Sequence, residues 1–264
     1  MPSNSKKRIK LLSKIRKKLL MKQISLGTWQ QMQSIEISKL LALSNYDWIA
    51  LDLEHGGFDN SHLSGAFDII LSQGALPLAR ISRPDNFEAR SVLDKGAAGI
   101  IIPMIETNEQ MEEIIEHSIW PPKGKRGVGF CNVNDFGKNF HQYKSESQKP
   151  FISIMIENIN ILSHLDKICS NNNVDSIFIG PYDLSASLGL TGDFKNKDFK
   201  KIQDEIFYIA KKYNKPFGFH VVEPSKKIVQ EKIKLGATFI AVGTDSVFIN
   251  TFANSERYYE REGD

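Results

Sequence analysis

Short apolar runs recur along the chain at intervals of about 20 to 30 residues, with one longer gap after residue 120. A continuous apolar run of this length between turn residues is typical of a strand that is buried on both faces. We interpret eight such runs as strands, at residues 24–29, 48–53, 76–80, 99–104, 151–156, 176–179, 216–220 and 238–242.

Segments with helical periodicity lie between these runs, at residues 34–42, 86–93, 108–117, 200–212 and 224–234. Gly96 and Gly236, in the similar phrases LDKGAAGIII and IKLGATFIAV, indicate helix ends that lead directly into buried strands. Each parallel strand needs a covering helix, and eight such units close a sheet on itself. The pattern therefore predicts an α/β fold, a TIM (β/α)8 barrel formed by residues 23–264.

The net charge of +3 is concentrated at the start of the chain. Nine basic residues lie within residues 1–22: Lys6, Lys7, Arg8, Lys10, Lys14, Arg16, Lys17, Lys18 and Lys22. Apolar residues such as Leu12 and Leu19 recur among them at helical spacing. We expect a basic helical extension that packs on one end of the barrel, while a membrane-surface segment, a nucleic-acid-binding segment and a presequence remain alternatives.

The composition, with 41% hydrophobic and 25% charged residues, is that of an ordinary soluble globular protein. It includes no apolar run near the roughly 18 residues that a membrane helix needs. Cys131 and Cys169 are far apart and outside any CxxC spacing, so we expect neither a zinc site nor a disulfide framework, and the reducing cytoplasm is the expected location.

Charged and imidazole side chains stand at or just after the ends of the predicted strands: Asp52, Glu54, His55, Arg80, Glu157, Asp183 and His220. The carboxyl ends of barrel strands form one rim, where ligands bind. Such a gathering is hard to explain by stability, because charges cluster only when they are paired or bind something. His220 has the alternative of a packed core histidine, and we leave it outside the mechanism.

Two carboxylates on neighbouring strands, Glu157 and Asp183, suit Mg²⁺ or Mn²⁺, which prefer oxygen ligands. Arg80 offers a planar fork for a carboxylate or a developing enolate oxygen. His55 is the natural general base, and Gly56-Gly57 after it would let backbone approach a ligand. No lysine stands at a predicted strand end, which argues against a Schiff-base aldolase.

Each of these residues also has a structural alternative. Asp183 follows the turn residues Gly180-Pro181 and could simply cap a helix that begins near Ser185. Arg80 could form an ion pair with a rim carboxylate. The segment from residue 120 to 150 is expected to be an active-site loop with a short helix, because long loops in compact domains are usually functional.

The chain resembles the HpcH/HpaI aldolase family of metal-dependent pyruvate aldolases. The resemblance runs from LGTW at Leu26 to GATFIAVGTDS ending at Ser246, through DWIALDLEH, PLAR, LDKGAAGIIIPMIET, WPPKGKRGVG, IMIEN and IFIGPYDLSASLG. It implies that His55 is the proton acceptor, that Asp94 raises its basicity, and that Arg80 stabilises the transition state. Without the resemblance, Asp94 would be interpreted as a surface residue at a helix end.

The resemblance further implies that Glu157 and Asp183 are the metal ligands and that the backbone of the residue before Asp183 binds the substrate carboxylate. That residue is Tyr182, where many relatives have alanine. Met155 stands where close relatives often carry glutamine, which removes a hydrogen bond to substrate. The loop after RGVG also departs from the family pattern, and we expect it to set the specificity for the acceptor aldehyde.

The function that follows is an aldehyde-lyase that reversibly cleaves a 4-hydroxy-2-oxo acid to pyruvate and an aldehyde, with Mg²⁺, Mn²⁺ or Co²⁺ as cofactor. Two alternatives are another metal-enolate lyase, such as an acyl-CoA lyase or oxaloacetate decarboxylase, and a non-catalytic binding protein with a basic tail. The expected partners are a small 2-oxo acid, an aldehyde and further copies of the chain, often with the last helix exchanged between neighbours and the site near a subunit boundary. Neither nucleic acid nor a membrane is expected.

Overall fold

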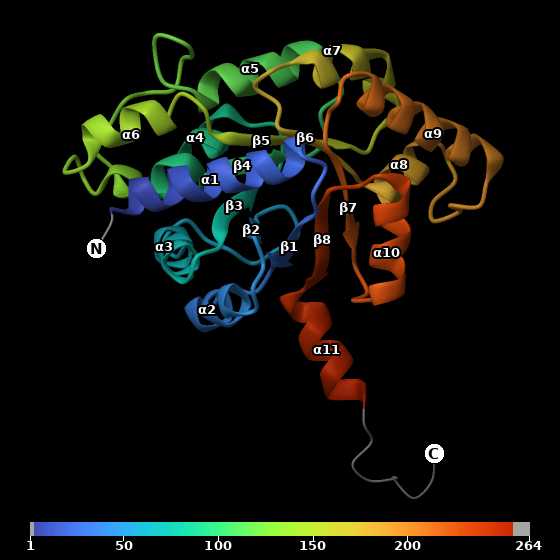
Figure 1. The fold of residues 1–264 in the computed structure, drawn as a ribbon, viewed down its shortest axis with the longest axis horizontal. Helices are drawn as coiled ribbons and strands as arrows, with labels where there is room; N and C mark the ends of the chain where they lie inside the picture. The colour runs from blue at the N-terminus through green and yellow to red at the C-terminus, as the bar shows by residue number, and fades with distance from the viewer. Residues whose placement is uncertain (1–2, 256–264) are drawn as a thin grey trace, which may run out of the picture.

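The computed structural model describes residues 3–255. Residues 1–2 of the predicted basic extension and residues 256–264 of the predicted barrel segment lie outside the described residues. Eight parallel strands form one closed barrel, in which each strand pairs with the next and β8 pairs with β1 (Figure 1). The strands are β1 (Ser25–Gln30), β2 (Trp48–Asp52), β3 (Leu76–Arg80), β4 (Gly99–Ile102), β5 (Phe151–Ile156), β6 (Ser176–Ile179), β7 (Phe217–Val221) and β8 (Phe239–Thr244). The predicted TIM barrel is confirmed.

Helices follow the strands and cover the barrel: α2 (Ile35–Leu43), α3 (Leu63–Gln73), α4 (Asn86–Lys95), α5 (Asn108–Ser118), α7 (Leu165–Ser170), α8 (Pro181–Ser187), α9 (Lys197–Lys212), α10 (Lys226–Leu235) and α11 (Asp245–Ser255). Side chains of Ser34 and Asp85 cap α2 and α4 by accepting a backbone N–H three residues on. Gly96 and Gly236, at φ 121° and 101°, end α4 and α10. Both predicted helix ends are therefore confirmed.

The barrel interior is filled largely by aromatic side chains. The rings of Trp48 and Phe239 stack at 4.3 Å between centroids, and Phe151 lies 5.1 Å from Phe239. Gly27 on β1 makes room for this packing, because a Cβ atom there would lie 2.0 Å from the Trp48 indole. The barrel interior is therefore a packed core rather than a pore.

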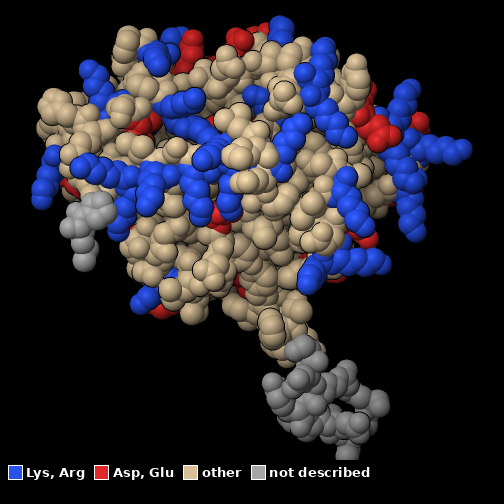
Figure 2. Space-filling view, in the orientation of Figure 1, with Lys and Arg blue, Asp and Glu red and all other residues tan. Residues whose placement is uncertain are grey.

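The basic start of the chain forms helix α1 (Asn4–Leu20), which closes the amino end of the barrel. Its buried residues Leu12, Ile15 and Leu19 belong to the same apolar cluster as the barrel interior. Its exposed side carries lysines such as Lys10 and Lys17, and Figure 2 shows the resulting band of basic side chains over α1. The helix is therefore part of the core on one side and a solvated basic surface on the other.

Residues 120–150 connect α5 to β5 and contain two short helices, η1 (Asn132–Asn134) and α6 (Phe140–Glu146). They pack beside α1, where the Arg8 guanidinium lies 2.7 Å from Glu146 and donates to the Val133 carbonyl. A connection from a covering helix to the next strand returns to the amino end of the barrel. The expected short helix is therefore present, but the segment contributes no residue to the cavity of its own barrel.

The last helix, α11, projects away from the barrel (Figure 1). From residue 249 to 254 its residues are exposed, including Ile249 at 52%. Exposed leucines also lie on α2, at Leu40 and Leu43. Among the helices that the structure describes, none combines the length and the apolar character needed to cross a membrane.

Candidate active site

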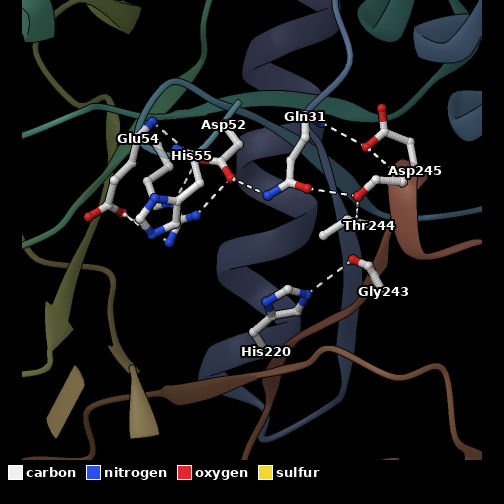
Figure 3. Close-up of polar contacts among 10 residues, drawn as sticks. Gln31, Asp52, Glu54, His55, His220, Gly243, Thr244 and Asp245 are labelled. Atoms are coloured by element: carbon white, nitrogen blue, oxygen red, sulfur yellow. Dashed lines mark hydrogen bonds and ion pairs between the residues drawn. The ribbon is translucent and has the colours of Figure 1, made fainter. Parts of the chain in front are cut away.

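A cavity of about 360 Å³ opens at the carboxyl ends of the strands. Its lining includes His55, Arg80, Tyr182 and Asp183, which come from the ends of β2, β3 and β6. Trp29, Gln31, His220 and Thr244 line it from β1, β7 and β8, and Figure 3 shows His55, Gln31, His220 and Thr244 among these residues. The structure thus brings four of the predicted site residues to one cavity.

Arg80 is held rigidly at the floor of this cavity. Its Nε and Nη2 donate to the two oxygens of Asp52 at 2.9 and 2.7 Å, and its guanidinium carbon lies 4.5 Å from the Trp29 ring centre. Burial of Asp52 opposes ionisation, but the hydrogen bonds and charge of Arg80 keep the pKa of Asp52 below its usual value. The ion pair between Arg80 and a rim carboxylate, which was the structural alternative for this residue, is present, and it fixes the guanidinium in place in the cavity lining.

The loop that carries His55 is held by the same carboxylate. Asp52 Oδ1 accepts the backbone N–H groups of Glu54 and His55, each at 3.2 Å. A Cβ atom on Gly56 would lie 2.1 Å from the Asp52 carbonyl, so this glycine serves close backbone packing within the protein rather than a ligand. The His55 side chain is 61% exposed at the rim, with Nε2 4.0 Å from Glu54 Oε2.

Glu157, at the end of β5, is almost fully buried beside the cavity. Its Oε1 accepts the Met104 backbone N–H, and its Oε2 reaches within 3.0 Å of the position that a Cβ on Gly180 would take. Burial, and then the negative charges of Glu54 and Asp183, raise the pKa of Glu157 to about 7. The carboxylates therefore repel one another, which is the arrangement that a cation relieves.

Glu54 adds a further negative charge to this group. Its Oε2 lies 3.0 Å from Arg80 Nη1, yet this oxygen has no hydrogen bond of good geometry to any residue within 3–255. Burial raises the pKa of Glu54, although the charges of Arg80 and His55 act to lower it. Arg80 is thus shared between two carboxylates, whose combined negative charge exceeds its single positive charge.

Asp183 lies in the first turn of α8, which begins at Pro181 with Gly180 at its N-cap. The helix begins earlier than the expected start near Ser185, and no side chain caps it, so the interpretation of Asp183 as a helix cap is wrong. The Asp183 side chain is exposed to the cavity. Tyr182, 56% exposed, lies with its ring 5.0 Å from that of Phe194.

The donor set fits a hard divalent cation. Glu157 and Asp183 supply carboxylate oxygens, and Mg²⁺ is usually held by one or two carboxylates while water and substrate complete its shell. Within residues 3–255, no three histidine, cysteine or carboxylate side chains gather in a way that could hold a metal by themselves. A metal here would therefore depend on substrate oxygens for part of its coordination.

Of the two predicted site residues outside the cavity lining, Glu157 lies buried beside the cavity, whereas Asp94 lies far from it. Asp94 lies in the last turn of α4, at the amino end of the barrel, with its Oδ1 2.7 Å from Arg126 Nη2. Arg126 is buried and also donates to the Tyr143 hydroxyl at 2.9 Å. Within one chain, Asp94 and His55 are at opposite ends of the molecule.

Gln31 and His220 are among the cavity residues that were not assigned a role from the sequence. Gln31 directly follows β1; its Nε2 donates to Asp52 Oδ2 at 3.1 Å, and its Oε1 accepts from Ser246. His220, in β7, has its Nε2 3.1 Å from the Gly243 carbonyl (Figure 3). Polar residues at strand ends were the available signal for both, but the two orientations depend on contacts between β1, β7 and β8.

Comparisons with known proteins agree with this architecture. Residues 26–251 match the family described as HpcH/HpaI aldolase/citrate lyase. The 5-keto-4-deoxy-D-glucarate aldolase of Escherichia coli strain E24377A is 30% identical over 234 residues, which cover 88% of this chain and 91% of that protein.

Two solved structures share the fold. A HpcH/HpaI aldolase/citrate lyase family protein from Burkholderia cenocepacia J2315 has a TM-score of 0.84 at 23% identity, covering 92% of this chain and 96% of that one. HpcH/HpaI aldolase from Desulfitobacterium hafniense DCB-2 has a TM-score of 0.81 at 24% identity, covering 90% and 93%. The chain belongs to the HpcH/HpaI aldolase/citrate lyase family.

Proposed function

We propose that this protein is a divalent-metal-dependent aldolase that reversibly cleaves a 4-hydroxy-2-oxo acid to pyruvate and an aldehyde. The observation that carries the proposal is the convergence of an imidazole, a fixed guanidinium and the Asp183 carboxylate on one cavity at the carboxyl end of the barrel, with Glu157 buried beside it and its pKa raised in part by the charge of Asp183. The aldolase relative from Escherichia coli supports the class of reaction.

Glu157 and Asp183 would hold the metal, which we take to be Mg²⁺ or Mn²⁺, with Co²⁺ as a possible substitute. When bound, such an ion supplies Lewis-acid polarisation of the substrate's keto oxygen. We further propose that the backbone at Tyr182 binds the substrate carboxylate. Tyr182 lines the cavity next to Asp183, so the two roles fall on adjacent residues.

His55 is the proposed proton acceptor. It stands exposed at the rim, where it can reach the C4 hydroxyl of a bound substrate. In the cleavage direction it takes that proton, the C3–C4 bond breaks and the aldehyde leaves. The enolate carbon then takes up one proton to give pyruvate.

Arg80 is the proposed stabiliser of the enolate oxygen. Because Asp52 already fixes two nitrogens of the guanidinium, the group does not have to reorganise as charge develops. Asp52 therefore acts as a positioning residue for Arg80 and, through the backbone of the loop, for His55.

Asp94 can raise the basicity of His55 only if it comes from a second copy of the chain, because within one chain it lies at the other barrel end. We therefore propose a homo-oligomer in which the amino end of one barrel meets the mouth of another. The projecting α11, with exposed Ile249, offers an element for such assembly. Residues 120–150 lie at the same end as Asp94 and would reach the mouth of the neighbouring copy with it.

A screen for pyruvate release tests the reaction. Purified protein is incubated with a panel of 4-hydroxy-2-oxo acids and Mg²⁺, Mn²⁺ or Co²⁺, and pyruvate is measured with a coupled dehydrogenase. We expect activity that disappears on chelation and returns when metal is added. An unchanged rate after chelation would remove Glu157 and Asp183 from their assigned roles.

Mixing two inactive variants tests the oligomer. His55→Ala and Asp94→Ala are unfolded together and refolded as a mixture, so that hybrid assemblies form. If the site is shared between copies, some hybrid sites hold both native residues and activity returns. A mixture as inactive as each variant alone, despite a confirmed oligomer, contradicts the shared site.

A further inference from the structure

The cavity has two sides of different character. The side at β5 and β6 carries the carboxylates proposed to hold the metal, so the pyruvyl half of a substrate belongs there. The opposite side is formed by β7, β8 and β1, which are neighbours in the barrel. Its lining is Trp29, Gln31, His220, Val222, Thr244 and Val247.

This second side presents uncharged groups to the cavity. Gln31 cannot turn to offer a new donor, because its amide is held by Asp52 and Ser246. Behind it lie two buried carboxylates, Asp52 and Asp245; Asp245 accepts the backbone N–H groups of Gln31 and Met32 at 2.8 Å each. An aldehyde with its own carboxylate would meet like charges here.

The positively charged side chains among the described lining residues do not offset the negative charge of Asp52 and Asp245. Arg80 is paired with Asp52 and faces Glu54. His55 lies at the rim and is assigned to proton transfer. Among the described lining residues of β7, β8 and β1 there is no lysine or arginine. The aldehyde half is therefore best matched by an uncharged molecule.

His220 gives this side one directed polar contact. Its Nε2 faces the Gly243 carbonyl, which accepts but cannot donate, so the ring proton is on Nε2. Nδ1 is then a bare acceptor on the edge of the ring away from Gly243 (Figure 3). It makes no hydrogen bond to any residue that the structure describes, while the Trp29 ring, 5.7 Å away between centroids, limits movement of the imidazole.

We propose that His220 is a substrate-binding residue whose Nδ1 accepts a hydrogen bond from a hydroxyl of the aldehyde half, so that the enzyme selects uncharged hydroxyaldehydes over aldehydes that carry a carboxylate. The inference deepens the proposed aldolase function and rests on it. Neither His220 nor this side of the cavity takes part in the bond-breaking steps assigned above.

Aldol addition to pyruvate tests the selection with three small aldehydes: glycolaldehyde, which has a hydroxyl, propanal, which has a methyl in its place, and glyoxylate, which has a carboxylate. With Mn²⁺ present, wild-type protein is expected to show its highest kcat/KM with glycolaldehyde. Glyoxylate is the most electrophilic of the three, so a lower kcat/KM with it would reflect the site. A preference for glyoxylate overturns the inference.

Variants locate the effect. His220→Phe is expected to lower the ratio of kcat/KM for glycolaldehyde to that for propanal about tenfold, the loss of one directed hydrogen bond. His220→Asn keeps an acceptor oxygen and should recover part of the ratio. His117→Phe is the matched control, because His117 also places a ring nitrogen against a backbone carbonyl but lies on α5 outside the cavity. An unchanged ratio in folded His220→Phe overturns the inference.

A nitrogen NMR spectrum of the wild-type imidazoles gives a second measurement that does not depend on turnover or on variants. We expect His220 to carry its proton on Nε2 at neutral pH, and its Nδ1 resonance to shift when glycolaldehyde is added with pyruvate and the diamagnetic ion Mg²⁺. A proton on Nδ1, or no shift, overturns the inference. If wild-type protein forms no product with any of the three aldehydes and releases no pyruvate from the 4-hydroxy-2-oxo acids, the proposed function itself has failed.

Discussion

The two ends of the barrel use the same charged groups in opposite ways. At the amino end, buried guanidinium groups are matched with carboxylates: Arg8 with Glu146 and Arg126 with Asp94, each at 2.7 Å. At the mouth, one guanidinium, Arg80, interacts with three carboxylates, Asp52, Glu54 and Glu157, and Asp183 adds a fourth negative charge near Glu54 and Glu157. The charges are balanced at the amino end, whereas the mouth carries an excess of negative charge that a bound cation would offset.

This difference separates structural from functional ion pairs. A buried pair whose charges balance has no remaining demand for a ligand, and its role is to hold elements together. A group of carboxylates that raise one another's pKa has an unmet demand, which a divalent cation satisfies. Variants of the Arg8–Glu146 pair should therefore change stability, whereas variants of the carboxylates at the mouth should change metal affinity and catalysis. Asp94, which is 30% exposed, is the exception at the amino end because of the role proposed for it toward a second copy.

The largest effect is expected at the amino end. Arg8→Met leaves Glu146 buried without its cation and should lower the free energy of unfolding by about 3–5 kcal/mol. Urea unfolding measures the change. The double variant Arg8→Met/Glu146→Met, which removes both charges, should recover most of the loss. A single variant as stable as the wild type would show that this pair does not hold α1 in place.

Arg80→Ala should slow catalysis at the mouth. The loss of one preorganised donor costs on the order of 2.7–4 kcal/mol, or about 10²–10³-fold in kcat. Pyruvate release under saturating metal measures it. Arg80→Lys keeps a cation beside Asp52 and should remain more stable than Arg80→Ala, while still losing the planar fork. Full activity in either folded variant removes Arg80 from the mechanism.

Glu157→Gln should weaken Mn²⁺ binding by at least about 100-fold, because even residues that only support metal ligands change affinity by 10–100-fold. Calorimetric titration measures this. In metal-free protein at pH 8 the same variant should melt at a higher temperature than wild type, since the ionised Glu157 is repelled by Glu54 and Asp183. Glu146→Gln, at the amino end, is the control: it should lose stability and keep its Mn²⁺ affinity.

The buried His220 should make stability fall in mild acid. Burial lowers the pKa of His220 to about 4 from an ordinary 6.5, so between these values the unfolded chain binds a proton that the folded protein does not. The free energy of unfolding should therefore drop by about 2 kcal/mol from pH 7 to pH 5 through this group alone. His220→Phe should remove that part of the drop, whereas His117→Phe, at a partly exposed position on α5, should not. Equal pH dependence in all three proteins would contradict the assignment.

The smallest effect is expected on the basic surface of α1. Lys10 and Lys17 are exposed and form no ion pair with any described residue. Lys10→Glu/Lys17→Glu should change the free energy of unfolding by no more than about 0.5 kcal/mol. Chemical denaturation measures it, and a larger loss would show that this face contacts a second copy or another partner.

Much of the fold could be predicted from the sequence because a buried parallel strand leaves a local signal. The runs at 76–80, 151–156 and 176–179 match β3, β5 and β6 residue for residue, and the run at 216–220 differs from β7 by one position. The run at 99–104 was predicted too long, because Pro103 and Met104 continue the apolar character after the ladder of β4 has ended.

The candidate site was predictable only as a set of residues on one rim. Their position follows from strand ends, so the order of residues along the chain is enough to group His55, Arg80 and Asp183, whereas Tyr182 was added by the family resemblance. Which of the rim residues pair could not be predicted. The Asp52–Arg80 bonds, for example, depend on the register that sets these residues opposite each other on β2 and β3.

The sequence by itself determined the barrel and the rim, because hydrophobic periodicity and strand-end polarity are local properties of a chain. The tertiary structure alone decided that residues 120–150 and Asp94 lie at the amino end, that Glu146 neutralises Arg8, and that the Gly243 carbonyl orients the His220 ring. These are contacts between residues far apart in the chain. Their free energy depends on distances and on burial, which exist only once the barrel has closed.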